Sequence, residues 1–329
     1  MPAGFGPIPG LKVGHAQSVP EPDGAGTGTG CTVLLCAEGM VAACDVRGGA
    51  VGERELEALR PGHIVERIHA LVFAGGSAFG LAAADGVVRW CVERGIGFDT
   101  GVAKVPIVPA AILFDLHLAG ASRPDAAMGY AAAKAASGAP PADGNVGAGT
   151  GCTVGKLFGM DCAMKAGIGC WTEEVATVGG TARVAALAAV NAFGDIRDPD
   201  TGKIIAGTRQ SKESIEFADT EAALRRGQIP KNFASSNTVL VAVATNAVLT
   251  RLEAQRVAIM ASAGVARTVS PAHTAFDGDI VFAVSVGPAG NPLRADVNAL
   301  GAAAAEAVAR AIVRSVTAAR SVAGIPGLA

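Results

Sequence analysis

The sequence predicts an α/β protein whose strands and helices stack as layers. Segments typical of strands and of helices are mixed along the chain, and two strand segments are neighbours. A strictly alternating parallel sheet would separate all its strands by helices. The 44 glycines and the aromatic content of only 4% indicate a core of small side chains with closely apposed backbones.

Three strands and two helices are predicted in the first half of the chain. Residues 31–36 and 40–46 are mainly apolar and are joined by a short turn, which predicts a β-hairpin. Residues 70–73 are an apolar run that stops before glycines, as expected of a buried strand. Residues 77–95 and 124–137 show helical spacing of apolar residues among alanines.

The second half predicts three buried strands and two helices. The strands are expected at residues 184–190, 239–245 and 279–286, although the alanine content of the first also allows a helix. The helices are expected at 250–263, which opens with a capping box, and at 296–320.

The remaining segments are loops in this prediction. Glycine-dense residues 144–155 and 163–169 predict tight turns between short strands. The polar residues 195–237 are expected to be the least ordered interior segment. Because no low-complexity linker divides the chain, residues 1–329 are expected to form a single domain.

Charge and hydropathy exclude several classes of partner. A net charge of -2 without a Lys/Arg cluster offers nothing for a phosphate backbone, so no nucleic-acid partner is expected. No apolar run is long enough to cross a bilayer, and residues 1–14 lack the features of a secretory signal. The sequence therefore predicts a cytoplasmic protein without a membrane partner.

Cysteine usage gives no sign of a metal centre. The 7 cysteines are scattered without a C-x-x-C pair, and the 5 histidines lack metal-ligand spacing. Buried thiols acting as small apolar side chains are expected instead. No metal and no organic cofactor is predicted.

Several motifs fail on inspection. The glycine runs 24–30 and 147–151 do not match G-x-G-x-x-G, and residues 150–157 lack both the first glycine and the hydroxyl residue of a P-loop. Residues 75–80 have the wrong spacing for a G-x-S-x-G elbow. His273 lies close to Asp277 in sequence, but a structural histidine is the preferred interpretation.

Thr238 is the strongest candidate for a nucleophile because small polar residues stop at this threonine, directly before an apolar strand. If the Asn237–Thr238 bond were cut, the free α-amine, with a reference pKa of about 8, would serve as base for its own hydroxyl. A structural threonine at a strand start is the alternative.

Four further residues accompany it. Asp277 and Asp279 stand two apart at a strand entrance, where alternation directs both carboxylates to one face; a turn that caps the strand is the alternative. Lys156 follows a glycine-rich turn and either extends to water or pairs with these carboxylates. Asn191 follows a buried strand and is either an oxyanion donor or a turn residue.

Together these residues resemble the active-site pattern of the DmpA-type aminopeptidases, which are self-processing N-terminal-nucleophile hydrolases. The resemblance spans nearly the whole chain. Four further blocks resemble family blocks: residues 45–50, 73–81, 144–151 and 164–169.

The resemblance implies a four-layer αββα sandwich and a precursor that cuts itself into chains 1–237 and 238–329. It implies that Thr238 is the nucleophile and new amino terminus and that Asn191 is an oxyanion donor. Asp277 and Asp279 would orient the amine and hydroxyl, and Lys156 would add positive charge. It also implies a small amide or peptide substrate and a homotetramer.

The site residues differ from the pattern of the aminopeptidase branch, and this difference favours another branch of the family. The aminopeptidase branch typically has a serine nucleophile and Ser-Gly-Glu where this chain has Asp277-Gly278-Asp279. The threonine, the two aspartates and the lysine are more similar to the 6-aminohexanoate (nylon) oligomer hydrolases. Acetyl transfer on the related ornithine acetyltransferase fold, and an uncut binding protein on this fold, are the alternatives.

Overall fold

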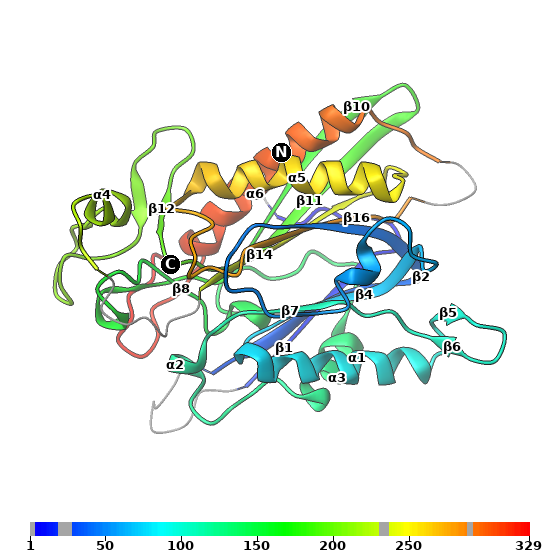
Figure 1. Cartoon of the computed structure of the whole chain (residues 1–329), viewed down its shortest axis with the longest axis horizontal. Helices are drawn as coiled ribbons and strands as arrows, with labels where there is room; N and C mark the ends of the chain where they lie inside the picture. Colours follow the sequence, from blue (N-terminus) through cyan, green and yellow to red (C-terminus); the bar gives the residue numbers. More distant parts are fainter. Residues whose placement is uncertain (1–3, 19–27, 230–236, 288–291) are drawn as a thin grey trace.

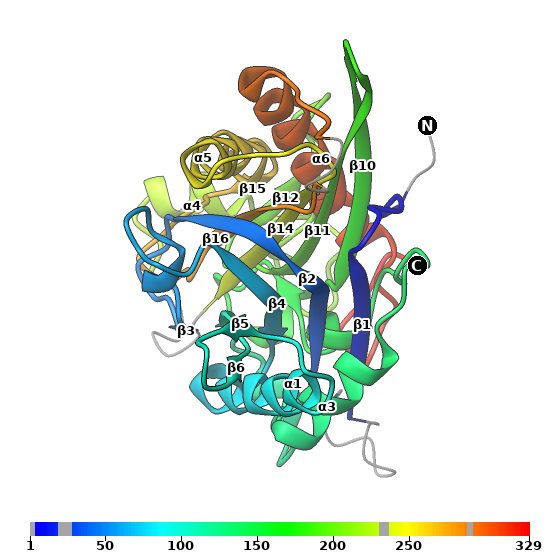
Figure 2. The same cartoon turned by 90° about the vertical axis from the view of Figure 1, so that its right-hand side faces the viewer.

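Two layers of strands lie between two pairs of helices in the computed structural model (Figures 1 and 2). The structure describes residues 4–18, 28–229, 237–287 and 292–329. Within these ranges, nine strands form one continuous mixed sheet with the path β10-β11-β14-β16-β2-β4-β7-β3, and β1 pairs with β2. No helix in the described part of the chain combines the length and apolarity needed to span a bilayer.

The strands of this sheet are β1 Lys12–Gln17, β2 Gly30–Val46, β3 Glu53–Arg54, β4 Arg67–Ala74, β7 Ala110–Ile112, β10 Ile168–Thr177, β11 Gly180–Asn191, β14 Thr238–Thr245 and β16 Ile280–Ser285. The short strands are β5 Phe98–Asp99, β6 Lys104–Val105, β8 Thr153–Val154, β9 Met164–Lys165, β12 Asp195–Arg197, β13 Ile204–Ala206 and β15 Val269–Ser270. The helices are α1 Ala83–Val92, α2 Leu116–Ala119, α3 Ala126–Ala135, α4 Thr220–Arg225, α5 Arg251–Thr268 and α6 Val297–Thr317. The 3-10 turns are η1 Glu57–Leu59, η2 Ser77–Ala82, η3 Gly147–Gly149 and η4 Met160–Cys162.

Strand β2 joins the two layers because it is 17 residues long. Its first half pairs with β1 and β4, and its second half pairs with β16. Alternate residues of β4 face opposite ways: Val72 packs with α1 and α3, whereas Phe73 packs into the core between the strand layers. The Phe73 and Phe282 rings meet there, with centroids 5.7 Å apart.

The outer helices complete the four layers. Helices α5 and α6 pack against each other and cover the layer that contains β10, β11 and β16. Helices α1 and α3 pack together below β4 and β1. This arrangement confirms the predicted four-layer α/β sandwich.

The predicted hairpin over residues 31–46 is wrong, since both halves belong to β2. Strand β4 pairs with residues 31–35 and again with residues 40–41. The intervening residues form an irregularity in the register, so the chain continues in the same direction instead of reversing.

Residues 195–229 also differ from the expectation of low order, because they contain β12, β13 and α4. The buried carboxylate of Asp195 accepts hydrogen bonds from the backbone amides of Thr208 and Thr220, at 2.8 and 2.7 Å, and so ties these elements together. Residues 230–236, the end of the segment in question, lie outside the described residues.

The other long elements agree with the sequence prediction. The segment at 184–190 is a strand, within β11, and the capping box of Thr250 and Glu253 starts α5. Helix α5 runs through Gly264 instead of stopping there. A Cβ at this position would lie 2.3 Å from the Ala305 carbonyl oxygen of α6, so the glycine serves the close approach of the two helices.

The contact between the strand layers gives a stability prediction. Phe73→Ala should lower the free energy of unfolding by about 3–5 kcal/mol, because it removes a buried ring and leaves a cavity. Urea denaturation measures this. The control Val178→Ala, at a fully exposed position, should change the value by no more than about 0.5 kcal/mol. Equal effects of the two substitutions would contradict the assigned core.

Candidate active site

The ends of three strands and their loops meet around Thr238. Thr238 is the first residue of β14 and is almost completely buried, with 1% exposure. Asn191, the last residue of β11, stands opposite it in the antiparallel register. On the other side, Asn237 forms a parallel bridge with Asp277, just before β16. Residues far apart in the sequence are therefore brought together by strand pairing.

The peptide bond before Thr238 is held by two hydrogen-bond donors. The Thr238 hydroxyl donates to the carbonyl oxygen of Asn237 at 2.5 Å. The backbone amide of Gly278 donates to the same oxygen at 2.6 Å. The hydroxyl thus lies beside the carbonyl group that it is expected to attack, and the Gly278 amide polarises that group.

Asp279 contacts the backbone next to Thr238. Its Oδ1 accepts a hydrogen bond from the Val239 amide at 2.7 Å. Its Oδ2 accepts one from the His273 amide at 3.1 Å and lies 2.9 Å from His273 Nδ1. The residue near His273 is therefore Asp279 and not Asp277, the neighbour considered from the sequence.

Asp277 is fixed by donors from two loops. The Phe193 amide donates to Oδ1 at 3.1 Å, and the Thr274 hydroxyl and amide donate to Oδ2 at 2.5 and 3.2 Å. Burial raises the pKa of Asp277 to about 6, and the neighbouring charge of Asp279 adds to this rise. Desolvation is the larger of these two causes.

Lys156 and Asn191 form a second cluster. Lys156 Nζ donates to the backbone oxygen of Asn191 at 2.9 Å and to its Oδ1 at 2.7 Å. The Thr153 amide also donates to this Oδ1, at 3.1 Å, and Asn191 Nδ2 donates to the Phe114 carbonyl at 2.9 Å. The donors on Oδ1, which include the Thr153 hydroxyl at 3.5 Å, and the acceptor for Nδ2 fix the orientation of the side-chain amide.

Lys156 takes neither of the arrangements considered from the sequence. It does not extend to water, and the ion pairs found among the described residues do not include one between it and a carboxylate. Burial lowers its pKa to about 7, and the charges of Asp277 and Asp115 counteract this effect in part. The ammonium group therefore changes protonation near neutral pH.

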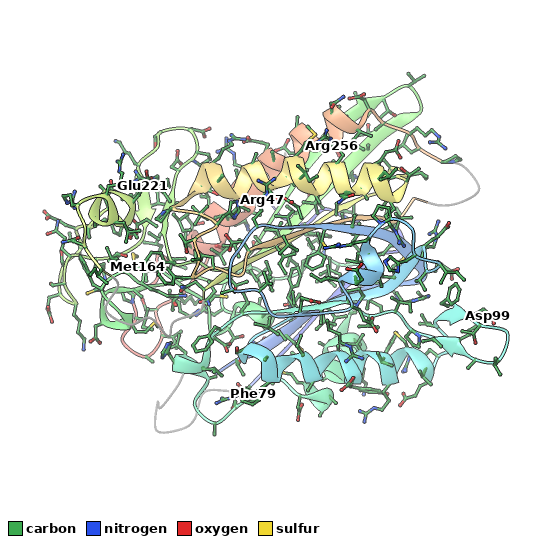
Figure 3. All side chains as sticks on the ribbon, viewed as in Figure 1. Arg47, Phe79, Asp99, Met164, Glu221 and Arg256 are labelled. Carbon is green, nitrogen blue, oxygen red and sulfur yellow. The ribbon has the colours of Figure 1, made fainter. Side chains whose placement is uncertain are left out.

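The loop after β2 contacts the backbone of the two aspartates. The Arg47 amide donates to the Asp279 carbonyl at 3.0 Å, and the Ala50 amide donates to the Asp277 carbonyl at 2.8 Å. Figure 3 shows Arg47 beside helix α5, where β2 has ended. This loop lies within residues 45–50, one of the blocks that resemble the family. Its hydrogen bonds to Asp277 and Asp279 give a structural reason for that resemblance.

The glycine-rich run at 147–151 supports the fold. The amide of Gly147 donates to Gln17 Oε1 at 2.7 Å, and that of Ala148 donates to Thr32 Oγ1 at 3.0 Å. These donors are engaged within the protein, which agrees with the rejection of a phosphate loop. Most of the run at 24–30 lies outside the described residues.

The structure thus brings all five candidate residues into one region of the fold. Sequence reasoning missed Thr274, Phe114 and the Gly278 amide, and it considered His273 only as a structural residue near Asp277. The only available signal was the proximity of His273 and Thr274 to the aspartates, since a backbone donor and a carbonyl acceptor leave no mark in residue type.

The fold is that of the N-terminal-nucleophile hydrolases. The chain superimposes on a Burkholderia sp. β-aminopeptidase with a TM-score of 0.71 at 24% identity, covering 100% of this chain and 92% of the other. For the L-aminopeptidase D-Ala-esterase/amidase of Ochrobactrum anthropi the TM-score is 0.70 at 18% identity, with 97% and 88% covered.

The chain belongs to peptidase family S58, whose model matches residues 7–329. It is 42% identical to a Mycobacterium tuberculosis (strain H37Rv) protein named as an uncharacterized aminopeptidase, covering 97% of this chain and 95% of that protein. It is 30% identical to the 6-aminohexanoate-oligomer endohydrolase of Kocuria sp. (strain KY2), covering 94% and 84%. The protein is therefore a peptidase or amidase, and the comparisons support hydrolysis over acetyl transfer.

The lowered pKa of Lys156 gives a prediction about stability and pH. Between pH 7 and its ordinary value of 10.5, the unfolded chain binds this proton more fully than the folded chain does. This group therefore makes the wild type more stable as the pH rises through that window. Lys156→Met lacks the contribution, so the stability of the variant relative to the wild type should fall from pH 7 upwards.

Urea denaturation of both proteins across this pH range measures the effect. Titrating groups that do not interact with Lys156 cancel in the difference. A difference in unfolding free energy that stays constant with pH would contradict the lowered pKa.

Proposed function

We propose that the chain cuts itself between Asn237 and Thr238 and then acts as an N-terminal-threonine amide hydrolase. The products would be chains 1–237 and 238–329, which together remain one domain. This proposal is supported by the hydrogen bond that the Thr238 hydroxyl donates to the Asn237 carbonyl oxygen, which also accepts a hydrogen bond from the Gly278 amide.

After cleavage, the new α-amine of Thr238 accepts the proton of its hydroxyl, and the oxygen attacks the carbonyl carbon of a substrate amide. The second amide hydrogen of Asn191 stabilises the oxyanion. The leaving amine takes that proton back from the Thr238 α-ammonium group, and water then hydrolyses the acyl-enzyme. Each turnover thus returns Thr238 to its starting state.

The other three residues hold these groups in place. Asp279 fixes the backbone directly after Thr238, and Asp277 stands beside the new amino terminus, where its charge orients the ammonium form. Lys156 directs the Asn191 carbonyl oxygen inward, so that the amide hydrogens are available as donors. None of these roles requires a metal or an organic cofactor.

The proposed substrates are short peptides or oligomers of ω-amino acids. The names of the Mycobacterium and Kocuria relatives, an aminopeptidase and an oligomer endohydrolase, support this range. A panel of such amides, each with a free and a blocked amino terminus, decides between the two classes. Hydrolysis of blocked oligomers would favour the endohydrolase type.

The proposal also includes a cytoplasmic homotetramer that has neither nucleic acid nor a membrane as partner. The family resemblance supports self-association. Sedimentation equilibrium of the processed protein tests the tetramer, and a monomer at micromolar concentration would refute it.

Thr238→Ala should leave a single inactive chain, because the variant lacks the attacking oxygen. Thr238→Ser is the matched control and should still be cut and active. Denaturing electrophoresis and intact-mass analysis measure processing, and the amide panel measures turnover. An active, uncut Thr238→Ala protein would end the proposal.

Asn191→Ala should lower kcat for amide hydrolysis by roughly a hundredfold or more, since it removes an oxyanion donor. The assay uses protein whose processing has been checked by mass. Unchanged turnover would remove Asn191 from the catalytic groups.

A further inference from the structure

We propose that self-cleavage and substrate hydrolysis use different oxyanion donors. The backbone amide of Gly278 would serve the cutting of the Asn237–Thr238 bond, and the side-chain amide of Asn191 would serve substrates afterwards. This inference rests on the proposed function and assigns a catalytic group to its first step.

The Gly278 amide already points at the atom that would carry the charge. It lies 2.6 Å from the carbonyl oxygen of Asn237, which becomes the oxyanion when the Thr238 hydroxyl adds to the carbonyl carbon. A donor that is in place before the reaction stabilises the developing charge without having to reorganise.

Hydrogen bonds hold the segment around Gly278 on both sides. The Asp277 carbonyl accepts the Ala50 amide at 2.8 Å, and the Asp279 carbonyl accepts the Arg47 amide at 3.0 Å. The Asp279 side chain is fixed in turn by the Val239 amide. The Gly278 amide is therefore held rigidly against the peptide bond that is to be cut.

Close packing explains why a glycine separates the two aspartates. A Cβ at position 278 would lie 2.6 Å from the Ala50 carbonyl oxygen and 2.9 Å from Thr238 Oγ1. Any side chain would push the loop after β2 or the attacking hydroxyl away. The glycine thus allows the amide, the hydroxyl and the carbonyl to lie together.

Asn191 has other partners in the uncut chain. Its Nδ2 donates to the Phe114 carbonyl, and its Oδ1 accepts Lys156 and Thr153. The Asn237 carbonyl oxygen accepts hydrogen bonds from the Thr238 hydroxyl and the Gly278 amide. The uncut geometry therefore favours Gly278 for this first step.

The two reactions also place their oxyanions differently. During self-cleavage the attacked carbon stays bonded to the Thr238 nitrogen, so the hydroxyl oxygen closes a small ring. During hydrolysis that nitrogen is a free amine, and the acyl group arrives from outside. One fixed donor cannot lie equally well against both oxygens, which is a physical reason for two donors.

Self-cleavage would be an N-to-O acyl shift followed by hydrolysis of the resulting ester. The Thr238 oxygen forms a bond to the Asn237 carbonyl carbon, and the carbon–nitrogen bond breaks. The hydroxyl proton ends on the leaving nitrogen, which becomes the new amine. Water then hydrolyses the ester, which yields the Asn237 carboxylate and restores the Thr238 hydroxyl.

The decisive experiment removes the N–H of Gly278 without adding a side chain. Incorporation of glycolic acid in place of Gly278 exchanges the amide for an ester and adds no side chain. Self-cleavage, followed by intact mass, should slow by about a hundredfold. The same exchange at Gly138, an open position, is the control and should leave the rate unchanged. Cleavage at the wild-type rate in the Gly278 ester would overturn the proposal.

Asn191→Ala provides the opposite arm. It should be cut at a rate within a few-fold of the wild type and yet lose amide turnover. An Asn191→Ala chain that stays uncut would show that Asn191 serves both reactions and would refute the inference. Thermal unfolding of each variant identifies a folding defect, and rescue of processing by Asn191→Gln would confirm that a missing donor was the cause.

Failure of this inference is distinguishable from failure of the proposed function. If wild-type protein remains uncut, the proposed function itself is wrong. If it is cut and active, but the Gly278 ester is cut equally fast, only the assignment of the donor is wrong.

Discussion

The carbonyl group of Asn237 is the point on which the proposed self-cleavage depends. It lies between a hydroxyl that can attack it and a backbone amide that can stabilise the product of attack. This arrangement requires β14 and the loop before β16 to pair in a single register. A shift of one residue would turn Thr238 to the other face of the sheet.

Strand register achieves this alignment. The pairing of β14 with β11 sets Asn191 opposite Thr238, and the bridge between Asn237 and Asp277 sets the aspartates beside it. Both neighbouring strands are buried, so slippage would place polar groups in the core. The position of the proposed catalytic groups is thereby tied to the stability of the sheet.

Most residues of the candidate site could be predicted from their side-chain type. The remaining contacts depend on which strands and loops meet in space. The positions of Thr238, Asn191 and the two aspartates at strand ends could be predicted from residue type and pattern, and their catalytic roles stay a prediction. The Gly278 amide could not, because a backbone donor is the same at every position. Lys156 was identified, but its partner was not, since its contact with Asn191 depends on how the loop after β8 meets the end of β11. The hairpin at 31–46 failed for a similar reason: only the pairing with β4 decides whether a short turn reverses the chain or forms an irregularity.

The order of strands has a consequence for the two fragments that scission would generate. Strands β14 and β16 come from the carboxy-terminal fragment, yet they lie between β11 and β2, which come from the other fragment. Neither piece would own a complete sheet. Breaking a single covalent bond would therefore release no subunit, and the fragments would part only if the interleaved ladder of hydrogen bonds were dismantled. Each mature protomer would behave as an obligate heterodimer whose two fragments come from the same precursor chain.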